Sequence, residues 1–185
     1  IYQVANNVVD FAHDLLDAGK IEEGKKQLKN ESVNVESILD ETVNLQTNFA
    51  NSRNIKIIKE YDNTNPHYLI SDHIVLSRIF TNLLSNAIKY SEKDSGKNIW
   101  LLIKEDKDNL TIIFKDEGYG ISDVNEAVKP YNNLNTPNKN EASSNGLGLY
   151  STKQLIENSH NGEFIIESTV GVGTIIHCRF PYSPQ

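Results

Sequence analysis

The chain has 185 residues, of which 38% are hydrophobic and 23% are charged, and its formal net charge is -7. It is long enough to bury a core and suits one domain plus an appendage. The negative charge argues against a general nucleic-acid or anionic-membrane binder, because no basic surplus exists to offset phosphates, so any phosphate affinity must be local.

The single cysteine, Cys178, excludes an internal disulfide and a multi-cysteine metal site in this sequence, and it favours a reducing compartment. No apolar run approaches the roughly 20 residues that a membrane-spanning helix needs. Because the sequence starts without methionine, we expect a fragment of a longer protein. We expect this part to be cytoplasmic, and membrane anchors or sensors of the parent protein could lie outside it.

The first predicted element is a helix over residues 2 to about 29, in which apolar side chains recur every three or four positions. This stripe, which requires a partner helix, is formed by Ile1, Val4, Val8, Phe11, Leu15 and Ala18. Asn34 is expected to cap a second helix over residues 35–52. The inward-facing residues of that helix are predicted to be Ile38, Leu39, Val43, Phe49 and Ala50.

Strands and a third helix are predicted next. Ile55, Ile57 and Tyr61 alternate with polar residues, which indicates a half-buried strand. The remaining elements of this part are a turn at residues 63–66, a helix from about 72 to 90, and strands at about 98–105 and 109–115 joined by a polar hairpin turn at 107–109.

Residues 122–145 are rich in asparagine and contain two prolines, and they predict a long irregular loop, which in a compact domain is usually a lid or disordered. A helix over 147–159 and a hairpin of 163–169 with 173–180 complete the chain. Helices and mostly antiparallel strands in separate groups predict an α+β fold. We expect a two-layer α/β sandwich with a mixed, mostly antiparallel sheet packed against helices, plus the N-terminal helix.

Three polar residues, Asn82, Asn86 and Lys89, are spaced at i, i+4 and i+7, so one face of the predicted helix presents them together. An Asn carbonyl is a hard oxygen ligand that suits Mg²⁺, and a Lys one turn further can meet phosphate charge. The alternative is that these are solvent-facing positions of an amphipathic helix. Its core residues would be Leu83, Leu84, Ala87 and Ile88.

Glycines mark further segments. Asp116 ends a predicted strand and could accept hydrogen bonds from an exocyclic amine, and Gly118 and Gly120 after it allow tight turns and close approach of a ligand. Gly146 and Gly148 precede a helix whose backbone N–H groups could face phosphate. The Asp116 segment and residues 171–174 could instead be ordinary turns, and a pair of glycines before a helix is weak evidence when taken alone.

Taken in order, these segments resemble the motifs of the catalytic, ATP-binding domain of sensor histidine kinases, a branch of the ATPase family that includes gyrase B, mismatch-repair and heat-shock chaperone ATPases. Residues 82–91 resemble the family's N box, 116–121 its G1 box, 146–149 its G2 box and 171–174 its closing G-x-G-T. The resemblance covers about residues 31–181, and four motifs in order are far more specific than any one.

The resemblance implies ATP and Mg²⁺ as cofactors. Asn86 would bind Mg²⁺, while Asn82 and Lys89 would lie along the phosphates as catalytic residues. Asp116 would take the adenine amino group, with Thr174 supporting that end of the pocket. The other implied cofactor-binding residues are Tyr90 beside the nucleotide, Gly118 and Gly120, which would shape the adenine pocket, and Ile121, Gly146, Leu147, Gly148 and Leu149.

Residues 15–25 resemble the second helix of the dimerisation domain that precedes such catalytic domains. The resemblance implies that residues 1–30 are the C-terminal part of that helix, and that residues 31–185 are the catalytic domain with an ATP lid at about 122–145. The first helix, which carries the phosphoacceptor histidine, is missing. His13 lies in a similar His-acidic-Leu pattern, but no Arg-Thr-Pro-like continuation follows, so we interpret it as a helix surface residue.

Two features depart from the family. The lid's usual Phe-containing box is reduced to residues 128–131, and Ser144 stands where the G2 box often begins with an extra glycine. Lys129 and Lys139 are the lid cations that could meet a γ-phosphate. The resemblance therefore implies nucleotide binding more directly than turnover.

The implied function is phosphoryl transfer from Mg²⁺-ATP to a histidine of the dimerisation domain in two-component signalling. The implied partners are the phosphoacceptor helix of the same or a partner subunit, a response regulator and a second copy of the parent protein, with no nucleic acid. ATP hydrolysis is disfavoured, because hydrolytic relatives place a Glu one turn before the metal-binding Asn and this chain has Asn82 there. A catalytically degenerate nucleotide-binding scaffold is the alternative, supported by the altered lid.

Overall fold

The computed structural model describes residues 29–61, 64–92, 94–130 and 147–182. The predicted helix over residues 2–29 therefore lies outside the described residues except at its last position. His13, Lys139, Ser144 and Gly146 also lie outside them.

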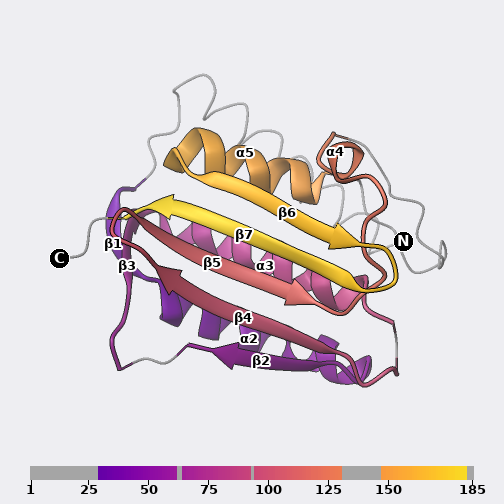
Figure 1. Ribbon diagram of the computed structural model, residues 1–185. Helices are drawn as coiled ribbons and strands as arrows, with labels where there is room; N and C mark the ends of the chain where they lie inside the picture. The colour runs from indigo at the N-terminus through magenta and orange to yellow at the C-terminus, as the bar shows by residue number, and fades with distance from the viewer. Residues whose placement is uncertain (1–28, 62–63, 93, 131–146, 183–185) are drawn as a thin grey trace, which may run out of the picture.

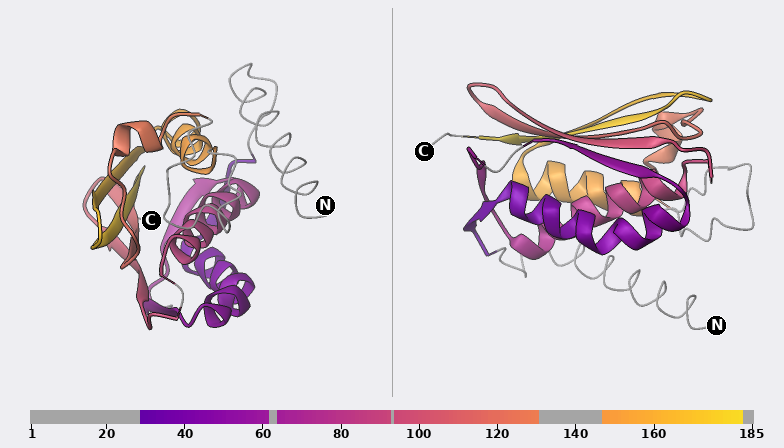
Figure 2. Two further views of the ribbon diagram at one scale, coloured as in Figure 1. Left: turned by 90° about the vertical axis from the view of Figure 1, so that its right-hand side faces the viewer. Right: turned by 90° about the horizontal axis from the view of Figure 1, so that it is seen from below.

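Within the described residues, one face of a mixed sheet is covered by helices α2 (Val35–Ser52), α3 (His73–Lys89) and α5 (Gly148–His160), as Figures 1 and 2 show. The strands of this sheet are β2 (Lys56–Glu60), β4 (Asn98–Glu105), β5 (Asn109–Asp116), β6 (Glu163–Thr169) and β7 (Gly173–Pro181). Their order across the sheet is β2-β4-β5-β7-β6. The two-layer sandwich predicted from the sequence is confirmed.

The sheet is mixed because β2 runs parallel to β4, whereas every other neighbouring pair in it is antiparallel. A connection that includes α3 joins the two parallel strands, as parallel pairing requires. The predicted sheet type, mixed and mostly antiparallel, is therefore correct.

Two short strands escaped the sequence prediction. β1 (Glu31–Asn34) and β3 (Tyr68–Ser71) pair antiparallel as a separate two-stranded sheet. Each has four residues, and each buries one large apolar side chain, Val33 or Leu69. Such a segment is too short to show the two-residue alternation by which a half-buried strand is recognised.

Side chains cap both helix starts, and the sequence predicted this for Asn34 only. The side chain of Asn34 accepts a hydrogen bond from the Ser37 N–H at 2.8 Å at the start of α2, and Asp72 does the same for Ile74 at 2.9 Å at the start of α3. The inward face predicted for α2 is wrong at Phe49, which is 39% exposed, because Ala50 occupies the buried position at that end of the helix.

The core lies between α2, α3, α5 and the sheet. The rings of Phe80 on α3 and Phe114 on β5 have centroids 5.8 Å apart and join the two layers. Cys178 on β7 is fully buried, and burial raises the pKa of its thiol, as expected for a small strand residue with no reactive role. None of the helices in the described part of the chain is long and apolar enough to span a bilayer.

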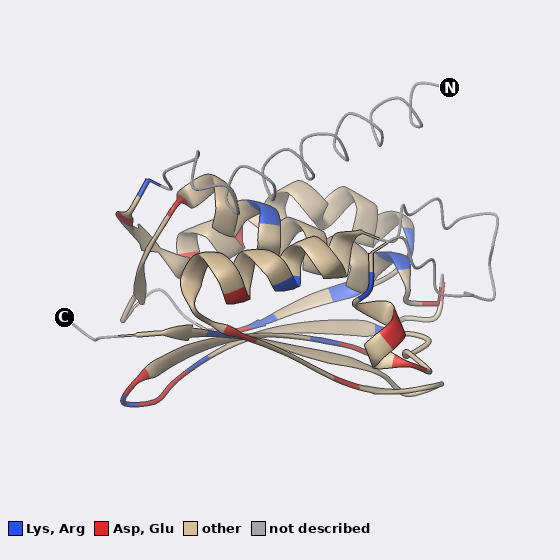
Figure 3. Ribbon diagram, turned by 90° about the horizontal axis from the view of Figure 1, so that it is seen from above, with Lys and Arg blue, Asp and Glu red and all other residues tan. Residues whose placement is uncertain are grey.

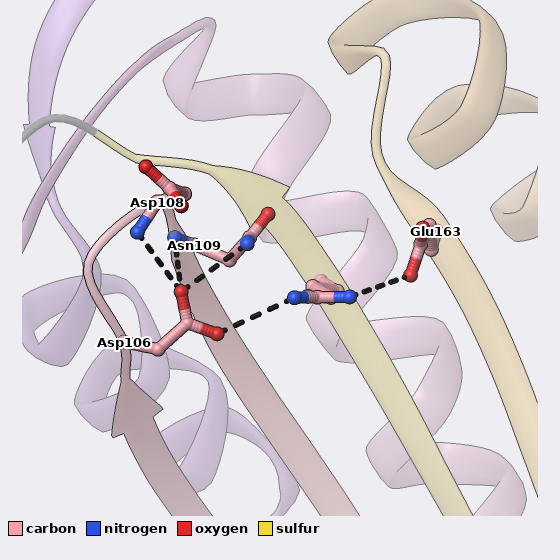
Figure 4. Close-up of polar contacts among 5 residues, drawn as sticks. Asp106, Asp108, Asn109 and Glu163 are labelled. Carbon is pink, nitrogen blue, oxygen red and sulfur yellow. Dashed lines mark hydrogen bonds and ion pairs between the residues drawn. The ribbon is translucent and has the colours of Figure 1, made fainter.

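The turn between β4 and β5 fixes the start of β5. One carboxylate oxygen of Asp106 accepts hydrogen bonds from the backbone N–H groups of Asp108 and Asn109, both at 2.9 Å (Figure 4). Its other oxygen lies 3.4 Å from Arg179 on β7, which also pairs with Glu163 on β6 at 3.1 Å. This charged turn (Figure 3) ties the hairpin to the neighbouring strands at one end of the sheet.

The predicted lid begins with structure rather than with irregular chain. Residues 124–127 form the short helix α4 (Val124–Ala127), whose first turn is capped by the Asp123 side chain through the Glu126 N–H at 3.0 Å. Lys129, one of the two expected lid cations, pairs with Glu126 at the end of this helix. The prediction of a loop over 122–145 is therefore wrong at α4, and residues 131–145 lie outside the described part.

Candidate functional site

The helix-facing side of the sheet ends in a row of polar residues. Phe114 and Ile176 are paired across β5 and β7 in the apolar interior, and two residues further along Asp116 pairs with Thr174. Ser168 on β6 pairs with Thr174 from the other side. Because side chains alternate between the faces of a sheet, Asp116, Thr174 and Ser168 lie side by side on the face that the helices cover.

Asp116 is held by the backbone through one of its two oxygens. Its Oδ1 accepts hydrogen bonds from the Gly118 N–H at 2.8 Å and from the Thr174 N–H at 3.1 Å. Burial raises the pKa of Asp116 to about 6, although both hydrogen bonds act in the opposite direction. No group in the described residues donates to Oδ2. The carboxylate is oriented by its protein partners and still has an oxygen available for a ligand.

The turn after Asp116 lies against the end of α3. The Tyr119 N–H donates to the carbonyl of Tyr90 at 3.0 Å. A Cβ on Gly118 would fall 2.6 Å from the same carbonyl oxygen, and a Cβ on Gly120, which has φ 71°, would fall 2.2 Å from the Thr169 carbonyl oxygen. Glycine is therefore needed at both positions, because any side chain would push the turn away from α3 or from β6.

The predicted polar face of α3 exists, and so does the apolar face opposite to it. Asn82, Asn86 and Lys89 are partly exposed, whereas the core residues predicted for this helix are buried. The side chain of Asn86 makes no hydrogen bond within the described part of the chain. Burial lowers the pKa of Lys89, whose ammonium lies 5.4 Å from the centre of the Tyr90 ring. The amphipathic pattern predicted for this helix is confirmed, and the binding role of its polar face stays a prediction.

Asn82 joins α3 to the start of α5. Its Nδ2 donates to the Gly148 carbonyl at 2.7 Å and to the Thr152 hydroxyl at 2.6 Å. A Cβ on Gly148 would lie 2.6 Å from Asn82 Oδ1, so the absence of a side chain at 148 lets the two helices approach closely. These contacts bring the segment around residue 82 and the segment around residue 148 together.

The first turn of α5 has features that favour an anion. Leu147 precedes the helix without a side-chain capping bond, and no acidic residue lies in the first turn. The backbone N–H groups there have no partners inside the helix, and the helix dipole adds partial positive charge at this end. Leu147 is buried and Leu149 packs against the core, so both side chains hold the first turn of α5 against the core. The predicted Gly146 lies outside the described residues.

Several residues that hold the site gave no signal in the sequence. The Ser168 hydroxyl receives a hydrogen bond from the Ile121 N–H at 2.8 Å and donates one to the Gly173 carbonyl at 3.0 Å. The Glu117 carboxylate accepts from the Asn98 N–H at 2.9 Å, which ties the turn after Asp116 to β4. The role of Ser168 could have been predicted only from the register of β6 with β7. Glu117 lies in the motif of residues 116–121, but the sequence assigned it no role.

Arg53 supports the other end of α3. Its guanidinium donates to the carbonyl of Ser91 at 3.0 Å and to that of Lys89 at 3.4 Å, so it satisfies carbonyl groups at the C-terminal end of that helix. Arg53 is itself the C-terminal cap of α2. The contact helps to hold the C-terminal end of α3, where Lys89 and Tyr90 lie. The sequence did not predict it, because an arginine that follows one helix gives no sign that it contacts another.

The oxygen atoms at the site suit a hard cation that takes most of its ligands from phosphate and water. The described residues contain no cluster of three or more His, Cys, Asp or Glu side chains that could hold a metal ion. The carboxamide of Asn86, which has no side-chain hydrogen bond to the described residues, offers one neutral oxygen. Mg²⁺ is commonly held by few protein oxygens together with water and substrate phosphates, so this donor set fits Mg²⁺ better than zinc or an all-protein calcium site.

The fold and the assembled motifs define an ATPase family. The profile of the histidine kinase-, DNA gyrase B- and HSP90-like ATPases matches residues 71–184, and the chain belongs to this family. The resemblance to the ATP-binding domain of sensor histidine kinases is thereby confirmed.

The chain is also similar to parts of longer curated proteins. The chain is 29% identical, over 98% of its length, to 22% of the non-motile and phage-resistance protein of Caulobacter vibrioides. It is also 29% identical, over 98% of its length, to 18% of the cell-division control histidine kinase PdhS of Brucella abortus. The chain thus spans about a fifth of the length of these curated relatives.

Solved structures show the same fold. The histidine kinase AdeS of Acinetobacter baumannii matches 97% of this chain over 82% of its own, with a TM-score of 0.76 and 17% identity. Full-length ShkA, solved in complex with AMPPNP, matches 99% of this chain over 37% of its own, with a TM-score of 0.81 and 17% identity. At such low identity these likenesses support the fold alone.

Proposed function

We propose that this chain binds Mg²⁺-ATP and passes the γ-phosphoryl group to a histidine on the dimerisation helices of its parent protein. The observation that carries the proposal is the hydrogen bonding that joins the motifs into one site. Asn82 bonds to Gly148, the Tyr119 N–H to Tyr90, and the Thr174 N–H to Asp116. Each motif alone is weak evidence, but contacts among the four motifs support the proposal that they bind one nucleotide.

The adenine end of the proposed site is the Asp116 carboxylate. Oδ2 would accept a hydrogen bond from the 6-amino group, while the two backbone N–H groups on Oδ1 keep the carboxylate in place. Because the carboxylate is largely removed from water, a hydrogen bond to its charged form is stronger than one made at the surface. Gly118 and Gly120 keep the backbone beside it free of side chains.

The phosphate end combines α3 with the start of α5. Asn86 would supply the protein oxygen to Mg²⁺, which when bound neutralises phosphate charge. Lys89 would meet phosphate oxygens as a cation, and the backbone N–H groups of the first turn of α5, which has no side-chain cap, would donate to them. These groups position and neutralise, which is the main contribution of a protein to phosphoryl transfer.

Transfer is favoured over hydrolysis by the engagement of Asn82. Its Nδ2 donates to two acceptors on α5, and a carboxamide has no basic site that could take a proton from water. The position that a hydrolase uses to activate water instead holds two helices together. We therefore assign Asn82 a positioning task beside the phosphates, with the acceptor imidazole as the nucleophile.

The proposal extends to the parent protein. Residues 1–30 would be the end of the dimerisation helix, residues 31–185 the catalytic domain, and about 122–145 the ATP lid. The partners would be a phosphoacceptor helix, a response regulator and a second copy of the parent. The second candidate, a nucleotide-binding scaffold without transfer, is favoured by one observation: Lys129 in the proposed lid is paired with Glu126 rather than free to meet a phosphate.

The experiment that separates these functions supplies an acceptor on a separate domain. The chain is mixed with a separately expressed dimerisation domain of the parent protein and with ATP labelled at the γ-phosphate. Acid-labile label on the acceptor histidine is expected for the kinase. Tight ATP binding by calorimetry without any transfer would favour the scaffold, and release of free phosphate without the acceptor would favour a hydrolase.

A further inference from the structure

The polar row at the end of the sheet contains a hydroxyl pair whose hydrogens can be assigned. Thr174 Oγ1 and Ser168 Oγ lie 2.9 Å apart, and their residues are direct partners on β7 and β6. Thr174 is 6% exposed and stands next to Asp116 in the same row. The direction of the hydrogen bond between the two hydroxyls determines what Thr174 can offer to a ligand.

The Ser168 hydroxyl has one hydrogen and two lone pairs. The hydrogen goes to the Gly173 carbonyl at 3.0 Å, because a carbonyl can only accept. One lone pair accepts the Ile121 N–H at 2.8 Å. The bond between the hydroxyls must then use the hydrogen of Thr174 and the second lone pair of Ser168.

The wall of the site beside Asp116 is consequently made of acceptors. The Thr174 hydrogen is directed away, toward Ser168, so the hydroxyl has only lone pairs left. Asp116 Oδ2, its neighbour in the row, is also an acceptor at pH values above its pKa of about 6. Two adjacent acceptors favour an amino group, which can donate to them. They disfavour a carbonyl oxygen, which would face lone pairs at a partly buried position and find no donor.

We infer that Ser168 is a specificity-determining residue, which makes the site prefer a 6-aminopurine over a 6-oxopurine by holding the Thr174 hydroxyl as an acceptor. This inference rests on the proposed function of nucleotide binding. A 6-oxopurine such as hypoxanthine could give its N1–H to Asp116. Its O6 would then meet Thr174, which has no hydrogen to donate, and this mismatch is what rejects it.

The test compares ATP with inosine triphosphate, which carries the same ribose and triphosphate and a 6-oxo group. Their dissociation constants are measured by calorimetry with Mg²⁺ for the wild type and for Ser168→Ala. The wild type should prefer ATP. In Ser168→Ala the Thr174 hydroxyl can rotate and donate to O6, so the preference for ATP should fall about fivefold, with inosine triphosphate binding more tightly relative to ATP.

Three variants keep this result interpretable. Ser168→Thr retains the hydroxyl and should restore the preference, and Thr169→Ala, which removes the exposed hydroxyl of the next residue on β6, should leave it unchanged. Thr174→Val removes the hydroxyl but keeps the N–H bonded to Asp116, so adding Ser168→Ala to it should have no further effect on the ratio. This double variant also tests the inference if Ser168→Ala alone folds poorly.

The outcomes separate the inference from the function on which it rests. If the wild type binds neither nucleotide, the proposed function fails. If it binds ATP and Ser168→Ala weakens both nucleotides equally, Ser168 only supports the fold of the site and the inference is overturned. An unchanged ratio in Ser168→Ala also overturns it, while the proposed binding of ATP stands.

Discussion

Strand β5 is flanked by an aspartate at each end, and the two carboxylates have opposite environments. Asp106, in the turn before β5, is exposed. One of its oxygens accepts hydrogen bonds from backbone N–H groups and the other faces Arg179. These partners hold the pKa of Asp106 below its usual range. Asp116, the last residue of β5, is largely buried, has partners on one oxygen only, and has a pKa raised to about 6. A fully paired surface carboxylate serves a turn, whereas a buried one with a free oxygen is suited to a ligand.

If nucleotide binds at the Asp116 end of the sheet, substitution of Asn86, the proposed Mg²⁺ ligand on α3, should reduce ATP affinity more than any other change proposed here. Asn86→Ala should weaken Mg²⁺-dependent ATP binding by at least about 100-fold, because it removes the neutral oxygen proposed as a metal ligand. Unfolding by urea should be unchanged, since the side chain has no partner in the described residues. Asn44→Ala, at an exposed asparagine of α2, is the matched control. Unchanged affinity by calorimetry would remove Asn86 from the site.

Exchange of the buried carboxylate tests the comparison directly. Asp116→Asn should weaken ATP binding about 30-fold, because the single amide oxygen must keep the Gly118 and Thr174 N–H groups, so an NH2 donor replaces the Oδ2 acceptor that would face the 6-amino group. The same change should stabilise the fold by at most about 3 kcal/mol at pH 7.5, since the pKa is raised from 3.8 to about 6 by burial of the charge. Calorimetry and urea unfolding measure the two effects, and a loss of both affinity and stability would contradict this account.

The pH dependence gives a smaller effect with a definite sign. A raised carboxyl pKa means that the folded protein holds a proton that the unfolded chain releases between about pH 4 and pH 6, so Asp116 adds stability at low pH and this contribution is lost as the pH rises through 6. ATP affinity should change the other way and fall about tenfold from pH 7.5 to pH 5, as the acceptor becomes protonated. Asp116→Asn should remove the part of this dependence that belongs to the protein; if it does not, another group titrates.

The smallest effect is expected at the opposite end of the sheet. Asp106→Asn should lower stability slightly, because it weakens the contact with Arg179 and the hydrogen bonds of the turn, and it should leave ATP affinity unchanged. Urea unfolding and calorimetry on the same preparation measure both. A loss of affinity comparable to that of Asp116→Asn would erase the distinction between the two carboxylates.

Much of the fold could be predicted because its signals are local. The cap at Asn34 and the apolar periodicity of the two segments predicted α2 and α3 almost to the residue, whereas the cap at Asp72 was not predicted. β1 and β3 were missed because four residues carry too little pattern, and their pairing spans residues far apart in the chain. Phe49 was misjudged because periodicity gives a direction around a helix but not whether a neighbouring element covers it.

The candidate site was predicted in part for the same reason. Asp116, Asn86 and Gly148 stand in short motifs, so the residue types themselves suggested their chemistry. Ser168 was invisible because its importance comes from the register of β6 with β7, which places it beside Thr174. The two bonds from Asn82 to α5 likewise depend on tertiary packing, so they could not be predicted, and the family resemblance implied only a position along the phosphates.

The contact between Asn82 and Gly148 also constrains how this sequence can vary. The two residues are 66 positions apart, yet the missing side chain of one makes room for the amide of the other. A substitution at 148 that adds even a methyl group is tolerated only with a smaller or reoriented residue at 82, and a change at 82 leaves the Gly148 carbonyl without its donor. Substitutions at positions 82 and 148 should therefore be coupled. In a library of random variants, folded proteins should carry changes at both positions more often than a change at one of them alone.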